Sequence, residues 1–189
     1  MNELDFIADF FQKQLKIPLD KVQKKELLKN IRKETFKKKE LIFSGGSSNT
    51  KQYIIEKGLI RLFLIDKNGK EFNILFAKEN QVIGDLSSPE PTSFFMETIE
   101  ESIVYSIDNA GLSALSEFIK NNNDYLKRSY IFIQKRLVSI LSKSAEENYI
   151  ELKTRYPDLI KRLPQYHIAS YIGVSAEFLS KIIKKLAKK

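Results

Sequence analysis

The chain has 189 residues, of which 42% are hydrophobic and 30% charged, so it can bury a core and is not of the disordered type. It has no cysteine and a single histidine, which excludes disulfides, thiolate nucleophiles, zinc fingers and cysteine-held iron–sulfur clusters and predicts no metal site. No apolar run is long enough for a bilayer, and the N-terminus carries acids instead of a basic region. We therefore expect a cytoplasmic protein without membrane segment or signal peptide.

The formal net charge of +8 is confined to one end of the chain. Residues 1–109 hold 17 Lys+Arg and 17 Asp+Glu, whereas residues 110–189 hold 15 and 7. A localised basic excess favours a polyanionic partner that binds the C-terminal part. The alternative is a lysine-rich surface that is merely solvated.

Two helices are predicted at the N-terminus. The first covers residues 2–16 and ends at Pro18, which cannot continue a helix. Asp20 can cap the second, which runs roughly over Lys21–Arg32. The apolar residues of these helices that we expect to face inward are Phe6, Ile7, Phe10, Phe11 and Leu15 in the first and Val22, Leu27, Leu28 and Ile31 in the second.

From Glu34 the pattern changes to short runs rich in Ile, Phe, Tyr and Val, which are separated by glycine-containing turns. The segment Asp66–Gly69 lies between two alternating runs and predicts a tight hairpin. About eight such strands in about 75 residues indicate a small barrel or jelly roll. A capped helical piece is then expected over Asn109–Ile119.

A long helix is predicted over Asn123–Ser144, because its apolar residues follow a 4-3-4-3-4 spacing. A second apolar stripe faces another way, so the helix needs two neighbours. We expect one stripe to pack on the chain's own barrel and the other on a second copy in a twofold dimer; the alternative is a helix buried twice within one monomer. The predicted dimerisation residues are Leu126, Tyr130, Ile133, Leu137 and Ile140, and the second stripe is Tyr125, Phe132, Val138 and Leu141.

A helix is expected over Ala145–Arg155 and a short turn or helix over Asp158–Leu163. The segment Gln165–Lys184 has the pattern of a helix-turn-helix. Gly173 suits the left-handed turn and Ser175 can cap the second helix. Ile168, Ile172, Val174, Phe178, Leu179, Ile182, Ile183 and Leu186 are expected inside, with Ala169 at the close crossing.

The exposed N-terminal surface of the second helix is the predicted reading surface for base edges in a DNA groove. A glutamate can accept from cytosine N4, and a lysine can donate to guanine O6 and N7. Lys161, Arg162, Lys188 and Lys189 suit phosphate contacts, and an αα-hairpin with a solvated lysine face is the plainer alternative. The predicted DNA-binding residues are Gln165, Tyr166, Ser175, Ala176, Glu177, Ser180, Lys181, Lys184 and Lys185.

The segment LPQYHIASYIGVSAEFLSKIIKKL resembles the helix-turn-helix of Crp/Fnr-type transcription regulators, in particular short members common in Bacteroidetes. Glu177, Ser180 and Lys181 match the family's Glu-x-x-Ser-Arg pattern, with lysine in place of arginine, and Ala176 stands where some members carry another arginine. Gly58, Gly69 and Gly84 with their strands resemble the cyclic-nucleotide-binding β-roll, and Asn123–Ser144 resembles the dimerisation helix.

The resemblance implies an α+β fold: N-terminal helices, a jelly-roll sensor, a long dimerisation helix and a C-terminal helix-turn-helix domain. The implied division is 1–121, 122–145 and 146–189. Family members usually add a β-hairpin wing after the recognition helix, and because the sequence stops at Lys189 we expect no full wing. The implied partners are double-stranded DNA, a second copy and RNA polymerase.

The family's phosphate cassette combines Gly-Glu-Leu with an arginine and a small polar residue, because a buried cyclic phosphate needs a cation. This chain has Gly84-Asp85-Leu86, but no arginine near Thr92 and Ser93. We therefore expect that the chain does not bind cyclic AMP in the way usual for the family. The sequence does not identify another small-molecule effector. Phe94 and Phe95 either line an apolar effector site or fill the barrel.

His167 is expected on the outer side of its helix, as an exposed polar residue or a phosphate contact. A cupin-like enzyme normally needs a histidine cluster, so we expect no enzyme. Two function classes stay open: a dimeric DNA-binding regulator, and a ligand-sensing module whose helical tail contacts a protein.

Overall fold

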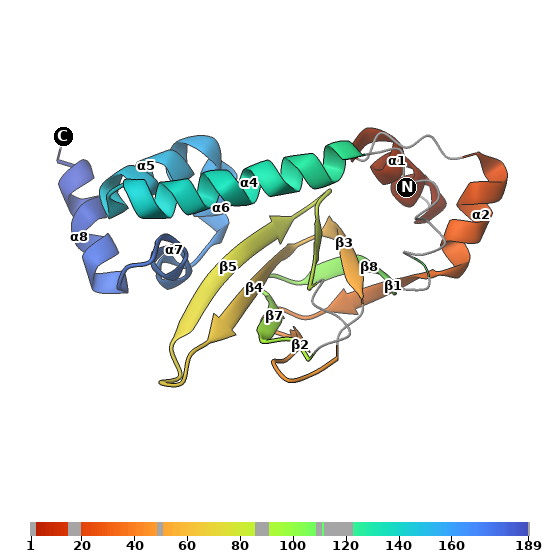
Figure 1. The fold of residues 1–189 in the computed structure, drawn as a ribbon, viewed down its shortest axis with the longest axis horizontal. Coiled ribbons are helices and arrows are strands. Elements are labelled where there is room, and N and C mark those ends of the chain that lie inside the picture. The colour runs from red at the N-terminus through yellow and green to blue at the C-terminus, as the bar shows by residue number, and fades with distance from the viewer. Residues whose placement is uncertain are drawn as a thin grey trace.

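A computed structural model describes residues 3–14, 20–48, 51–85, 91–108, 111 and 123–188. Eight strands form two four-stranded antiparallel sheets, ordered β1-β8-β3-β6 and β2-β7-β4-β5. Figure 1 shows the two N-terminal helices at one end of this β-roll and the C-terminal helices at the other, with α4 running between the two ends. The strands are β1 (Ile31–Phe36), β2 (Leu41–Phe43), β3 (Gln52–Lys57), β4 (Leu59–Ile65), β5 (Glu71–Lys78), β6 (Val82–Gly84), β7 (Phe94–Thr98) and β8 (Ser102–Ile107). The helices are α1 (Glu3–Gln14), α2 (Lys21–Lys29), α4 (Asn123–Ser142), α5 (Ala145–Arg155), α6 (Pro157–Arg162), α7 (Gln165–Ile172) and α8 (Ala176–Leu186).

The predicted α+β class and the eight-stranded roll are confirmed, and so is the hairpin between β4 and β5. In its turn, Asp66 accepts hydrogen bonds from the backbone of Asn68 and Lys70 through one carboxylate oxygen. Gly69 has a φ of 79°, which glycine adopts at no steric cost. The turn residues therefore fix the register next to the turn, and a shift between Leu62 and Phe63 then brings Arg61 of β4 opposite Phe76 of β5.

The N-terminal helices differ partly from their prediction. The stripe Phe6, Ile7, Phe10 and Phe11 is buried, and it packs with residues of β3 and β8. Asp20 caps α2 by accepting from the backbone of Gln23. However, α2 ends at Lys29, and Ile31 begins β1 instead of continuing the helix, because residues 31–36 pair with β8. Val22, which we expected inside, is 76% exposed. Leu15 lies outside the described residues, as does most of the helix predicted over residues 109–119.

Apolar side chains of both sheets fill the interior of the roll. Among the nine buried residues of this cluster, Ile55, Ile60, Met96 and Val104 are fully inaccessible. Phe94 packs against the same cluster from β7. Alternation along the strands sends its neighbour Phe95 to the other face, where its ring stacks on Phe63 at 5.4 Å. The roll is therefore packed as a core in which Phe94 fills space.

The long helix α4 is confirmed, but its surroundings differ from the prediction. None of its residues belongs to any of the three buried clusters of the described chain. The second stripe does not pack on the roll, since Val138 is 60% and Leu141 76% exposed. Of the predicted dimerisation residues, Tyr130, Ile133, Leu137 and Ile140 are also exposed, and the side chain of Leu126 is outside the described part.

The C-terminal helices pack around a core of their own, which also includes residues of the roll. Ser144 caps α5 in a capping box with Glu147, and Pro157 occupies the first turn of α6. The buried residues of this core include Tyr149 and Leu152 of α5 together with Leu59 and Phe76 of the roll. The C-terminal helices thus share a core with the roll, with α7 lying on β5.

Candidate nucleic-acid interface and its link to the roll

Two helices joined by a tight turn, α7 and α8, form over the residues predicted for a helix-turn-helix, because the local signals there agree. Gly173 ends α7 with a φ of 80°, and the backbone N–H of Val174 donates to the carbonyl of Ala169 at 3.0 Å. This is the left-handed C-cap that glycine favours. Ser175 then caps α8 by accepting from the backbone N–H of Phe178 at 3.2 Å. The turn between α7 and α8 is therefore held by local hydrogen bonds, one between backbone groups and one to the Ser175 hydroxyl.

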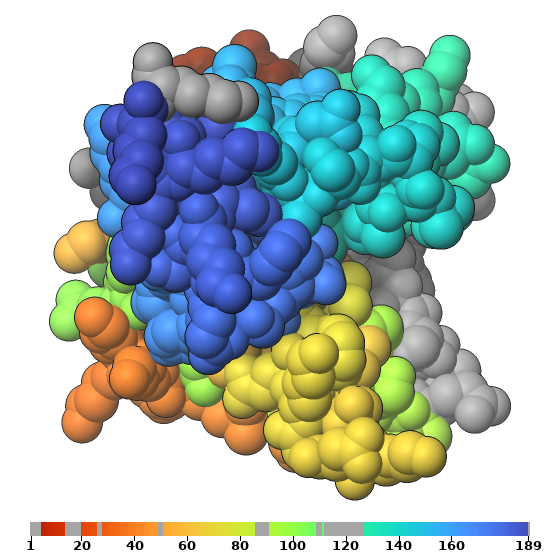
Figure 2. Space-filling view, turned by 90° about the vertical axis from the view of Figure 1, so that its left-hand side faces the viewer, coloured from red at the N-terminus to blue at the C-terminus, as the bar shows by residue number. Residues whose placement is uncertain are grey.

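Helix α8 has two sharply different faces. Leu179 is fully buried and Ile182 is 6% exposed, and both pack in the core of the C-terminal helices. Opposite them Glu177, Lys181 and Lys184 are exposed. In Figure 2, α8 lies at the front of the molecule, and no other described segment covers it. A charged helix face is therefore open to a partner.

The other predicted DNA-binding residues lie around this face. Ser180 and Ala176 are half-buried, and Ala176 packs against the core, so it presents little surface to a partner. Lys185 forms an ion pair of 2.6 Å with Glu146 of α5. The backbone N–H of Glu177 and the hydroxyl of Ser175 lower the pKa of the Glu177 carboxyl, so it is ionised at neutral pH. The remaining predicted residues, all exposed, are Gln165, Tyr166 and Ser175.

Phe178 corrects the prediction for the interior of this motif. We expected it inside the first turn of the second helix, but its side chain is 50% exposed. The inner positions of that turn are taken by Ala176 and Leu179. A helical pattern rich in apolar residues does not say which of them stays outside. Phe178 thus joins the exposed surface next to Glu177.

Arg162 is also placed differently from its prediction as a phosphate contact. Its guanidinium binds Glu79 after β5 and Glu100 before β8, with N–O distances of 2.8 and 2.7 Å. Burial disfavours the charge of Glu79, but the hydrogen bonds from Arg162 and from the backbone outweigh it and lower the Glu79 pKa to about 2. Arg162 therefore clamps the C-terminal helices to the roll.

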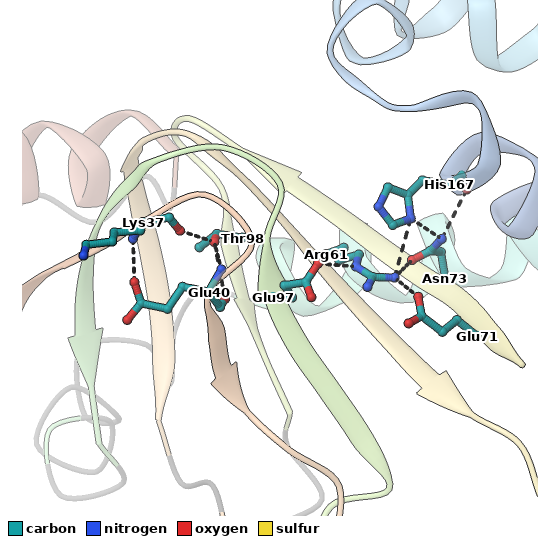
Figure 3. A network of polar contacts seen from close by, with 8 residues as sticks. All are labelled: Lys37, Glu40, Arg61, Glu71, Asn73, Glu97, Thr98 and His167. Carbon is teal, nitrogen blue, oxygen red and sulfur yellow. Dashed lines mark hydrogen bonds and ion pairs between the residues drawn. The ribbon is translucent and has the colours of Figure 1, made fainter. Parts of the chain in front are cut away.

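His167 contradicts its prediction most clearly, since it is 3% exposed and faces the roll. Figure 3 shows it at the end of a polar chain that crosses the outer face of β7, β4 and β5. Arg61 of β4, itself 4% exposed, binds Glu97 at 3.1 Å and Glu71 at 2.5 Å. The Asn73 amide accepts from Arg61 at 3.3 Å and meets His167 Nδ1 at 3.2 Å.

The surroundings of His167 fix its protonation state. Nδ1 faces two donors, the Asn73 amide and, at 3.5 Å, the guanidinium of Arg61. A permanently charged guanidinium cannot accept a hydrogen bond, so Nδ1 must be the acceptor and the imidazole neutral. Burial, and secondarily the charge of Arg61, lowers the His167 pKa to about 4. The neutral ring is thus part of the docked arrangement.

Two further residues hold α7 and α4 to the roll. The Ser170 hydroxyl donates to the carbonyl of Glu71 and accepts from the backbone N–H of Asn73, both at 2.9 Å. Arg136 of α4 donates to the carbonyls of Asn73 at 3.4 Å and Tyr171 at 3.1 Å. Sequence reasoning missed these roles, because each depends on partners far away in the chain.

The predicted effector pocket is brought together only in part. Thr92 is buried, and its Oγ1 accepts from the backbone N–H of Phe94 at 3.0 Å. Asp85 is buried after β6, and its carbonyl accepts from the Gln52 amide at 3.3 Å. A Cβ at Gly84 would lie 2.6 Å from that amide, so the glycine permits the close approach. Ser93 is exposed, and Leu86 lies outside the described residues.

Within the described chain, no group of three or more His, Cys, Asp or Glu residues could hold a metal ion. Nor does any described helix combine the length and apolarity needed to cross a membrane.

Comparison with known proteins identifies the architecture. Residues 33–117 match the family model of the cyclic nucleotide-binding domain. FixK2 from Bradyrhizobium japonicum superposes with a TM-score of 0.69 at 16% identity, covering 84% of this chain and 85% of that one. The c-di-GMP responsive global regulator CLP from Xanthomonas campestris gives 0.70 at 11% identity, with 87% and 90% covered. A protein from Eubacterium rectale described as a transcriptional regulator of the Crp/Fnr family gives 0.70 at 14%, with 89% and 84% covered.

The chain has the fold of a Crp/Fnr regulator. The resemblance drawn from the sequence is thereby confirmed at the level of fold, from the β-roll through the C-terminal helices. No curated protein matches the sequence. The exposed face of α8 and the polar contacts of His167 and Ser170 with the roll are described from the residues of this chain.

Proposed function

We propose that the protein is a sequence-specific DNA-binding transcription regulator that acts through α8. The observation that carries this proposal is the division of α8 into a buried apolar face and an open face with Glu177, Lys181 and Lys184. A recognition helix needs such rigid seating, because side chains that read bases must be held in register with the groove. Glu177 can accept from cytosine N4 and Lys181 can donate to guanine O6 and N7.

The charge distribution supports the same proposal. All of the basic excess of the chain lies in residues 110–189, which include α8. Lys184 and Lys188 are exposed at and beyond the end of the open face and suit phosphate contacts. Arg162 is not available for phosphate contact, because its guanidinium is paired with Glu79 and Glu100. Contact with phosphates would thus come from α8 itself.

Dimerisation through α4 is part of the proposal. Six large apolar side chains of this helix are at least 48% exposed, which is costly on a helix that faces only water. A second copy packed on this face would bury them and place two α8 helices about 34 Å apart, one turn of DNA. These residues are Tyr130, Ile133, Leu137, Val138, Ile140 and Leu141.

For the roll we propose a sensor that does not bind cyclic AMP in the usual manner of the cyclic nucleotide-binding family. Residues 86–100 contain no lysine or arginine to neutralise a cyclic phosphate. The Thr92 hydroxyl already caps the start of β7, and Phe94 fills the interior. One neighbour in fold is described as c-di-GMP responsive, so effectors other than a cyclic mononucleotide occur on this architecture.

A second candidate function is a signalling module whose C-terminal helices contact a protein. The exposed Phe178 and Tyr166, both about half exposed, favour it, since aromatic anchors are typical of protein interfaces. We rank it below DNA binding because the same surface carries lysines, which are depleted at the centres of protein interfaces. Contact with RNA polymerase stays a prediction under either function.

One experiment separates the two candidates. Fragments of the source genome are incubated with the full chain, and bound fragments are resolved on a gel at several salt concentrations. We expect selected promoter fragments to bind saturably, with an affinity that falls steeply as salt rises. Equal weak binding to all fragments would favour the protein-contacting module. Calorimetric titration with cyclic AMP and cyclic GMP tests the sensor, and binding at micromolar concentration or tighter would refute our account of the pocket.

A further inference from the structure

A cavity of about 80 Å³ lies where α4 meets the C-terminal helices. Its walls come from α4, α5 and α7, the elements that join the long helix to the reading domain. The residues that line it are Phe132, Lys135, Arg136, Ser139, Ile140, Asn148, Glu151, Leu152, Arg155, Tyr156, Tyr171 and Ile172.

Arg136 is the central group of this cavity. Its guanidinium lies 3.5 Å from the centre of the Tyr171 ring, and its Nη2 donates to two backbone carbonyls. None of the carboxylates in the described chain pairs with it, and its described partners are the two carbonyls and the side chain of Tyr171. Burial lowers the pKa of Arg136, and the Tyr171 side chain opposes this effect only in part. The half-buried cation is thus held by neutral groups and has no counter-ion in the described chain.

The other charges around the cavity do not neutralise Arg136. Lys135 and Arg155 bring two more cations to its wall. The single carboxylate, Glu151, is already held by Lys143 at 2.6 Å and Arg155 at 3.0 Å, and its oxygens also face the Ser139 hydroxyl at 3.2 Å. Because three cations share one engaged carboxylate, the cavity keeps an excess of positive charge.

We propose that this cavity binds a small oxyanion group, a carboxylate or a phosphate, against the guanidinium of Arg136. A planar guanidinium matches the two oxygens of such a group. A volume of about 80 Å³ is several times the roughly 10–15 Å³ that a cavity needs to hold one water molecule, and it admits one group of this size. Lys135 and Arg155 add charge at the rim, and the Tyr156 ring offers an apolar wall for whatever the oxyanion is attached to.

A bound oxyanion would act on the junction between α4 and the reading domain. Arg136 already joins α4 to Asn73 of β5 and to Tyr171 of α7. An anion that also engages Arg155 would join α5 to the same group, so the ligand would favour the docked arrangement of the C-terminal helices. Anion binding itself does not depend on whether α8 contacts DNA, so the proposed function can fail without affecting this site.

The test is a calorimetric titration of the full chain with inorganic phosphate and, separately, with acetate. Sodium chloride keeps the ionic strength constant, so that general screening does not change during the titration. We expect saturable binding of at least one of the two anions. Its dissociation constant should rise about tenfold or more in Arg136→Gln, because hydrogen bonds to a charged group are lost. The arm that binds identifies the anion as phosphate-like or carboxylate-like.

Matched variants locate the site. Arg155→Gln and Lys135→Gln should weaken binding by smaller factors, whereas Lys153→Gln, which removes an exposed cation of α5 outside the cavity, should not change it. Circular dichroism checks folding; should Arg136→Gln unfold, Arg155→Gln carries the test. The proposal is overturned by the absence of saturable binding, as expected if a carboxylate of a second copy neutralises Arg136. Equal weakening in Lys153→Gln, or unchanged binding in the cavity variants, also overturns it.

Discussion

Asn73 of β5 and His167 of α7 lie 94 positions apart in the sequence, yet the amide Nδ2 and the imidazole Nδ1 are 3.2 Å apart. The same amide also donates to the backbone carbonyl of His167 at 3.3 Å. Through Asn73, α7 is connected to the buried Arg61 and its two carboxylates. The position of α7 is therefore set by polar contacts with the outer face of β4 and β5 in the roll.

This contact predicts a loss of stability in mild acid. The folded state keeps His167 neutral down to about pH 4, whereas in the unfolded chain the ring binds a proton below its ordinary pKa of 6.5. Stability from the neutral ring is therefore complete above about pH 6.5 and falls as the pH drops toward 4. The loss is of the order of 3 kcal/mol, because each pH unit between the two pKa values contributes about 1.4 kcal/mol.

Urea unfolding followed at pH 7 and pH 4.5 measures this effect. The charged groups that act on His167 are Arg61, Glu71 and Lys39, and carboxylates elsewhere titrate in the same range. The His167→Gln variant therefore serves as the control, since it keeps the carboxylates. We expect a markedly smaller drop between the two pH values in this variant. An identical drop in both proteins would show that His167 does not titrate on unfolding.

A second prediction concerns the clamp of Arg162 on Glu79 and Glu100. Arg162→Met keeps most of the side-chain length but leaves two half-buried carboxylates without their cation. We expect a loss of about 2 kcal/mol in the free energy of unfolding at pH 7. Lys161→Met, one position earlier on an exposed site, is the matched control and should change stability by less than about 0.5 kcal/mol. Equal effects of both substitutions would contradict the clamp.

The same clamp has its own pH dependence. The folded-state pKa of Glu79 is about 2, below its ordinary value of 4.5, so its contribution is complete above about pH 4.5 and is lost as the pH falls through 2. Acid unfolding of Arg162→Met should therefore depend less on pH between 4.5 and 2 than that of the wild-type chain. Parallel acid unfolding curves would indicate that the charges of Glu79 and Arg162 are not coupled.

The exposed face of α4 predicts an oligomer that one charge can disrupt. Leu137→Glu places a carboxylate in the centre of the apolar stripe, where burial against a second copy would be costly. Sedimentation equilibrium should give a dimer for the wild-type chain and a monomer for the variant. Lys153 is exposed on α5, away from the stripe. Lys153→Glu also makes the net charge more negative, and this control variant should stay dimeric. A monomeric wild-type protein would remove dimerisation from the account.

The helix pair α7 and α8 could be predicted from the sequence because its signals are local. Gly173, the cap at Ser175 and the spacing of Ile168, Leu179 and Ile182 each act within a few residues of one another. The β-roll was likewise indicated by its turns, with the Asp66–Gly69 hairpin as the clearest case. Local geometry and the period of apolar residues carry this information directly.

The links between the parts could not be predicted in the same way. His167 lies on α7 between the exposed Tyr166 and the buried Ile168, and only the tertiary partner Asn73 shows that its polar ring faces inward. Val22 and Phe178 are apolar residues that stay exposed, which a binary pattern cannot distinguish from core. In the sequence, Arg162 is one more basic residue near the helix pair. Its partners Glu79 and Glu100 lie far away in the chain, and only the fold of the roll places them beside it. The roles of Glu177, Ser180 and Lys181 in reading bases stay predictions.

The central claim is that α8 reads base sequence through its open face, and Lys181→Ala tests it most directly. Dissociation constants are measured for the wild-type and variant proteins on a genomic fragment selected by the wild type and on a scrambled duplex of equal length, at one fixed salt concentration. We predict a loss of about 1–3 kcal/mol on the selected fragment and a much smaller loss on the scrambled one, while Lys153→Ala on α5 changes neither. Equal losses on both duplexes would contradict the claim, because Lys181 would then contact only phosphates.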